Sequence, residues 1–171
     1  MTTIEISEPV TLITDYILSI VVLLFGISLF RSRNRTSDKA TLLWTAGFLT
    51  AAAAAAAGGT FHGFAYYFSA PAHRSLWRVT VGLIAASAGF VTVAVLKQSE
   101  VTNSQKRWLR AGILLTLVGV VIQRSGVSPA ANFNHNDLYH CIQTVAFYLL
   151  FRAAAQIKPT ASPLPTAGRS S

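Results

Sequence analysis

The sequence contains few charged residues and almost no cysteine. Only 12% of its 171 residues are Asp, Glu, Lys or Arg, about half the share in an ordinary soluble domain. The single cysteine, Cys141, excludes an internal disulfide framework and a zinc module built from several cysteines. Hydrophobic residues make up 52% of the chain, which excludes intrinsic disorder over most of its length. A composition this apolar is typical of an integral membrane protein.

Long apolar stretches account for most of the chain. A helix needs about 20 mostly apolar residues to cross the roughly 30 Å hydrocarbon core of a bilayer. Stretches of this kind lie at residues 9–30, 41–68, 76–96, 109–127 and 137–157. The weakest of them is 109–127, because charged and amide side chains interrupt it.

These stretches predict an all-α fold, a polytopic transmembrane helix bundle with about five spans. We expect one transmembrane domain over residues 1–158, because the short connections leave no room for a separate soluble domain. Residues 159–171 are rich in Pro, Ser and Thr and are predicted to form a disordered tail.

The basic residues are unevenly divided between the two sides of the predicted bundle. Eleven of the 14 Lys and Arg residues fall in or beside the first and third connections or near the C-terminus. The positive-inside rule then places the N-terminus outside and the C-terminus in the cytoplasm. The formal net charge of +8 is therefore a topology signal, and no nucleic-acid partner is expected. Trp44 and Trp108 at inner helix ends, and Trp77 at an outer end, are typical of interfacial aromatic belts.

The ionisable residues that remain gather near the outer ends of the predicted spans. Such residues are costly inside a membrane and are candidates for function. Asp15 and His62 each lie about six residues from the outer end of a span, roughly 9 Å deep at 1.5 Å per residue. Further polar residues near outer ends are His73, Arg124, His135, Asn136, Asp137 and His140. Because separate segments deliver these side chains to one depth, we expect a site there.

The donor types in this group suit a metal ion. Asp137 and His140 are three residues apart and share a helix face, and His62 adds a histidine from another helix. Zinc takes three or four such ligands at about 2.0–2.2 Å. His135 joins the set if it precedes the helix and folds back, and Asp15 then acts as a general base or orients a ligand. Structural alternatives remain open: Asp137 is also placed to cap its helix, and the others to stabilise helix packing.

Two segments resemble a known group of proteins. Gly58-Gly-Thr-Phe-His62 and Asn134-His-Asn-Asp-Leu-Tyr-His140 resemble an uncharacterised family of small bacterial integral membrane proteins. That family is remotely similar to the membrane hydrolase superfamily of alkaline ceramidases and progestin/adipoQ-type receptors. The resemblance implies that His62 and His140 bind zinc, and that the protein hydrolyses a lipid-like amide or ester in the outer leaflet. It also implies a bacterial inner membrane protein, surrounded by membrane lipids.

Three functions are therefore open. The first is the zinc-dependent hydrolase. The second is haem binding and electron transfer, with His62 and His140 as axial ligands and Arg124 near a propionate. The third is a non-catalytic subunit or scaffold whose polar residues hold the helices together. An oligomer, or a partner subunit that supplies further helices, is compatible with each of them.

Overall fold

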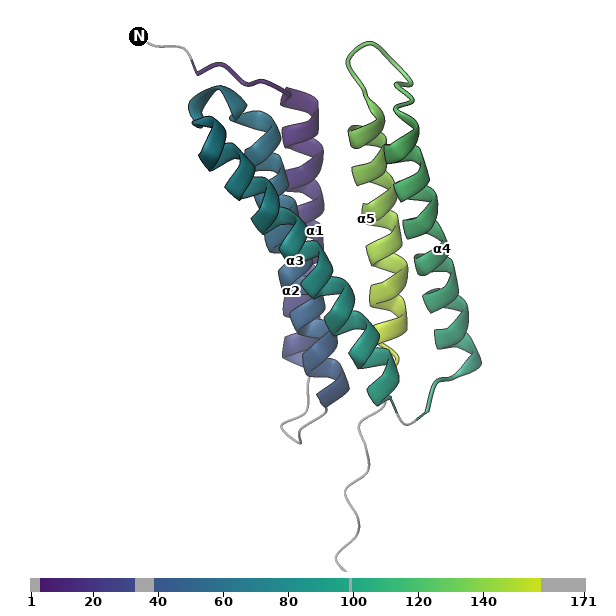
Figure 1. Ribbon diagram of the computed structural model, residues 1–171. Helices are drawn as coiled ribbons and strands as arrows, with labels where there is room; N and C mark the ends of the chain where they lie inside the picture. The colour runs from purple at the N-terminus through teal and green to yellow at the C-terminus, as the bar shows by residue number, and fades with distance from the viewer. Residues whose placement is uncertain (1–3, 33–38, 99, 158–171) are drawn as a thin grey trace, which may run out of the picture.

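Five α-helices make up the part of the chain that the computed structural model describes, residues 4–32, 39–98 and 100–157 (Figure 1). They are α1 (Pro9–Ser32), α2 (Lys39–Gly63), α3 (Ala70–Lys97), α4 (Asn103–Ser125) and α5 (His135–Ala154), with a short 3-10 helix, η1 (Ala65–Tyr67), between α2 and α3. The all-α prediction is confirmed. The predicted tail at 159–171 lies outside the described residues.

Four of the described helices, α1 to α4, are long and apolar enough to cross a bilayer. Large apolar side chains remain exposed along them, as expected for surfaces that face lipid rather than water. On α3 and α4 these include Val79, Val81, Ile84, Val93, Leu96, Ile113, Leu114, Leu117, Val118, Val120 and Val121. The protein is therefore a helical membrane protein.

The fifth helix lies close to its predicted position, but it does not qualify as an apolar span. α5 has 20 residues and lies alongside α1 and α4 in Figure 1. Its first turns carry His135, Asn136, Asp137 and His140, and it is not among the four apolar spans. α4, which the sequence predicted to be the weakest span, does qualify.

The helices form two groups. α2 packs between α1 and α3, α5 packs against α4, and the main contact between the groups is that of α1 with α5 (Figure 1). α2 packs closely because its buried face consists largely of small residues, Ala51, Ala52, Ala54, Ala55, Gly58, Gly59 and Gly63 among them. Small residues let helix backbones approach in a membrane, where burial of apolar surface does not drive association.

Two helix boundaries near the predicted histidines differ from the sequence prediction. The end of the bundle at which α1 begins is called the outer end, after the predicted topology. There α2 ends at Gly63 and not at Phe68, so His62 lies in its last turn. The Ser7 backbone N–H donates to the Gly63 carbonyl at 3.0 Å, and the Ser7 hydroxyl donates to the carbonyl of His62. These bonds satisfy carbonyls that the helix end leaves free.

The start of α3 also lies earlier than predicted. Ser69 caps the helix by accepting from the Ala72 N–H, and Pro71 occupies the first turn, where its fixed φ suits a helix start. His73 therefore belongs to the first turn of a helix and not to a connecting loop.

Aromatic and aliphatic side chains fill the inner half of the bundle. Phe25 of α1 stacks on Phe151 of α5 with ring centroids 4.6 Å apart, and Phe48 of α2 contacts both rings. Trp44, which the sequence placed in an interfacial belt, is only 1% exposed and stacks on Phe48. This core closes the bundle below the polar residues of the outer end.

Candidate functional site

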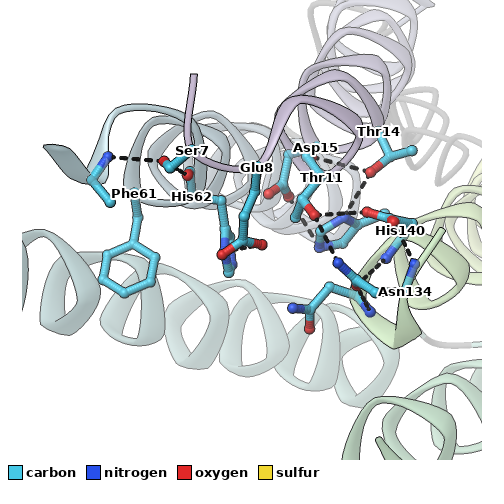
Figure 2. A network of polar contacts seen from close by, with 12 residues as sticks. Ser7, Glu8, Thr11, Thr14, Asp15, Phe61, His62, Asn134 and His140 are labelled. Carbon is cyan, nitrogen blue, oxygen red and sulfur yellow. Dashed lines mark hydrogen bonds and ion pairs between the residues drawn. The ribbon is translucent and has the colours of Figure 1, made fainter. Parts of the chain in front are cut away.

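A network of polar side chains lies at the outer end, between α1, α2 and α5 (Figure 2). Its members come from the segment before α1, from α1 itself, from the last turn of α2 and from the start of α5. They are Ser7, Glu8, Thr11, Thr14, Asp15, His62, Asn134, Asp137 and His140. The structure thus brings Asp15, His62, Asp137 and His140 to one end of the bundle.

His140 joins α5 to α1 through both of its ring nitrogens. Nε2 lies 3.2 Å from Oδ1 of Asp15, and Nδ1 lies 3.1 Å from the hydroxyl oxygen of Thr14. The side chains of His140 and Asp15 are both buried, 7% and 5% exposed. The imidazole is therefore held between a carboxylate and a hydroxyl.

The second carboxylate oxygen of Asp15 has a different environment. Oδ2 is buried and has no hydrogen-bond partner among the described residues. Gly58 of α2 faces the carboxylate, since a Cβ at this position would lie 3.4 Å from both oxygens. Buried polar atoms are nearly always paired with protein groups or ordered water, so an unpaired one calls for a functional explanation.

His62 lies beside Glu8, which precedes α1. Its Nδ1 is 3.2 Å from Oε2 of Glu8, but the contact falls outside hydrogen-bond geometry and Nδ1 has no such partner among the described residues. The Glu8 side chain is 43% exposed and that of His62 is 16% exposed. Glu8 is therefore the more solvent-exposed member of this pair; Figure 2 draws both side chains.

Asp137 caps its own helix and also binds α1. Oδ2 accepts from the backbone N–H of Asn134 at 2.7 Å, and Oδ1 accepts from the Thr11 hydroxyl at 2.7 Å. The Asn134 side chain in turn accepts from the backbone N–H groups of Asn136 and Asp137, and donates to Thr11 Oγ1. Asp137 therefore takes part in capping α5, which is one of the roles that the sequence left open for it.

The remaining predicted residues lie beside the network. His135 is the first residue of α5, and its Nδ1 is buried without a hydrogen-bond partner among the described residues. Asn136 accepts from Gln123 of α4 at 3.4 Å. Arg124 is exposed in the last turn of α4. His73 contacts the carbonyl of Phe61 at 3.2 Å and stacks on its ring.

Sequence reasoning missed Glu8, Thr11 and Thr14. A signal for the two threonines was present, because Thr11 lies three and four residues before Thr14 and Asp15 in an otherwise apolar helix. This spacing places polar groups on one helix face. Glu8 gave no such signal, since it precedes the helix and meets His62 only through the tertiary fold.

The predicted zinc donors do not form a ligand set in this arrangement. In the described ranges, no group of three His, Cys, Asp or Glu side chains is placed to hold a metal ion. Asp137 is occupied by its cap, His140 has partners at both nitrogens, and His62 faces Glu8. This division does not fit the three or four converging ligands that zinc requires.

The space that haem would need beside α2 is also occupied. The glycine face of α2 packs directly on α1, because a Cβ at Gly59 would lie 3.0 Å from the Asp15 Cβ and the Tyr16 ring. At Gly63 a Cβ would approach the Leu12 side chain to 2.7 Å.

A family model matches the chain over residues 10–111 and 90–159, which together extend from α1 through α5. The chain belongs to this family, described as Family of unknown function (DUF6962). No curated protein and no solved structure matches the chain. The expected membership in an uncharacterised family is thus supported, whereas no link to the alkaline ceramidase and progestin/adipoQ receptor superfamily is shown.

Proposed function

We propose that this membrane protein hydrolyses an ester or amide of a lipid-like substrate, with His140 as its general base. One observation carries the proposal: the His140 ring lies between the Thr14 hydroxyl, at 3.1 Å, and the Asp15 carboxylate, at 3.2 Å. A hydroxyl within hydrogen-bond reach of a base that a carboxylate orients is the arrangement of nucleophile, base and acid in covalent hydrolases.

Asp15 selects the tautomer of His140 in this mechanism. Oδ1 accepts the Nε2–H, which leaves the Nδ1 lone pair free for a proton. The Thr14 hydroxyl lies 3.1 Å from Nδ1 and also 3.1 Å from the carbonyl of Thr11, so its proton has two acceptors.

The reaction then proceeds in two steps on this chain's own groups. Thr14 Oγ1 attacks the carbonyl carbon as its proton passes to His140 Nδ1, and the bond to the leaving alkoxide or amine breaks as that group takes the proton back. Water, deprotonated by the same nitrogen, then attacks the acyl–Thr14 ester; the bond to Thr14 Oγ1 breaks as Oγ1 takes that proton back from Nδ1, and the acid is freed. No metal takes part in either step.

The surroundings favour a substrate that arrives from the outer end. Glu8 and His62 face the exterior there, while apolar side chains fill the bundle below. A polar head can approach the network from this end while an apolar tail lies along lipid-facing helix surfaces, so the site suits an amphiphile.

Hydrolysis by protein purified in detergent tests the proposal, with a short aryl ester and a fatty acyl amide as substrates. We expect His140→Gln and Thr14→Val to reduce turnover roughly 100-fold or more, and Thr14→Ser to retain part of it. Thr92→Val is the matched control, because Thr92 makes a comparable bond to its own helix, to the Ala88 carbonyl, on exposed α3. Full activity of His140→Gln would contradict the general-base role. Activity that chelators abolish and zinc restores would replace this mechanism with the metal-dependent one.

A second candidate is a non-catalytic scaffold, which the contacts of Thr11 with Asp137 and Asn134 favour. They join α1 to α5 without any unpaired group. If this is the whole role, the wild-type protein turns over neither substrate, and substitutions at His140 and Asp15 change only the thermal unfolding midpoint.

A further inference from the structure

A pocket of about 250 Å³ lies at the outer end beside α2 and α3. Five residues line it: Phe61, His73, Arg74, Trp77 and Arg78. It adjoins the polar network at His62, whose ring lies 5.1 Å from that of Phe61, but none of the five lining residues is a member of that network.

Three rings form one wall of the pocket. Phe61 stacks on His73 with centroids 3.9 Å apart and planes 13° apart, and it lies 5.1 Å from the Trp77 ring. The contact of His73 Nε2 with the Phe61 carbonyl, at 3.2 Å, fixes this arrangement between α2 and α3.

Two arginines provide the charge of the pocket. Arg74 and Arg78 are four residues apart on α3 and therefore lie on one side of the helix. Neither makes an ion pair within the described residues, where both ion pairs involve histidine. The pocket thus has two guanidinium groups and no acid to match them.

The depth of Arg78 makes an unmatched charge costly. α3 has 28 residues, a length of about 42 Å at 1.5 Å per residue, which exceeds the roughly 30 Å hydrocarbon core. Arg78 lies about 12 Å from the start of α3, and so near the boundary between headgroups and hydrocarbon. Charged side chains at this level pair with other groups or reach toward the headgroups.

We propose that this pocket binds an anionic phospholipid, with its phosphate between Arg74 and Arg78 and its glycerol backbone against the rings of Phe61 and Trp77. Guanidinium groups bind phosphate through paired hydrogen bonds, and tryptophan favours the membrane interface. The site is independent of the hydrolase proposed above, because it uses none of that site's residues.

The test compares two lipids on the full chain in detergent. Phosphatidylglycerol is expected to raise the thermal unfolding midpoint by about 5 °C or more above the effect of phosphatidylcholine with the same acyl chains. The Arg74→Gln, Arg78→Gln double variant is expected to lose this difference. A matched control, Arg107→Gln with Arg110→Gln, removes two exposed arginines beside Trp108 at the inner end and is expected to retain it.

Several outcomes would overturn the site. Equal stabilisation of the wild-type protein by both lipids would do so even if the double variant fails to fold. An undiminished phosphatidylglycerol effect in the double variant, or in both single variants, would also do so. Inorganic phosphate that reproduces the full effect would assign the pocket to free phosphate instead of a lipid.

Discussion

Asp137 uses both of its carboxylate oxygens, one to cap α5 and one to bind Thr11 of α1. The side chain is 1% exposed, so water cannot replace either partner when the carboxylate is removed. A buried donor that loses its acceptor costs about 1–3 kcal/mol, and loss of a helix cap costs about 1 kcal/mol. One residue therefore stabilises both a helix end and a contact between helices.

Asp137→Ala is expected to lower the free energy of unfolding by about 3 kcal/mol, because it removes both contributions. Thermal unfolding in detergent measures the change. Thr102→Ala is the control, since Thr102 takes part in the capping box at the exposed start of α4, and only the cap, about 1 kcal/mol, is lost there. Equal losses in the two variants would show that the bond to Thr11 contributes nothing.

Single residues also show what the sequence can and cannot predict about the site. Asp15 and His140 were predicted because ionisable groups are rare in apolar spans and the chain has few. The sequence allowed Asp15 to pair with Arg124 or with a histidine but did not single out His140, because spacing fixes a position on one helix and not the rotation of one helix against another. For the same reason, the sequence could not show that the residues predicted to bind zinc have other partners in the fold.

At the scale of a helix, α2 depends on glycine where it passes Asp15. A Cβ at Gly59 would lie 3.0 Å from the Asp15 Cβ and from the Tyr16 ring, closer than packed carbon atoms normally approach. A Cβ added at Gly89 of α3 would, by contrast, lie in open space.

Gly59→Ala is therefore expected to destabilise the protein by about 1–3 kcal/mol, because α1 and α2 must separate. Gly89→Ala is expected to be neutral or slightly stabilising, since alanine favours a helix over glycine. The thermal unfolding midpoints of the two variants make the comparison. A Gly59→Ala protein as stable as the Gly89→Ala protein would contradict the close approach.

Helix ends were predicted less well than helices. Apolar length gave the existence and order of α1 to α5, since membrane thickness sets that length. The end of α2 was not predicted, because Ser7, 55 residues before His62, supplies the bond that terminates it. A local sequence pattern carries no information about a cap that comes from another segment.

At the scale of the whole molecule, α5 decides how many times the chain crosses the membrane. Of the helices that the structure describes, four qualify as spans by apolar length alone. α5 lies beside α1 and α4, and its polar first turns bind α1 rather than lipid. Because packing against other helices can hold a less apolar helix in a membrane, we predict that α5 is the fifth span.

We predict that the chain crosses the membrane five times, which places its two termini on opposite sides, with the C-terminus inside. A fluorescent reporter fused after Ser171 is expected to be active, and a phosphatase that requires an external location is expected to be inactive there. The same two reporters at the N-terminus are expected to give the opposite result. Termini on the same side would show that α5 does not cross.

The pairing of Asp15 with His140 also has a consequence for how the chain is inserted into the membrane during its synthesis. Thr14, the neighbour of Asp15, is separated from His140 by 126 positions, and α1 therefore emerges from the ribosome well before α5. α1 therefore enters the bilayer with a carboxylate whose partner has not yet been synthesised, and a charge in that position is costly. A nascent chain that stops before α5 retains this defect, because α5 supplies the partner of Asp15.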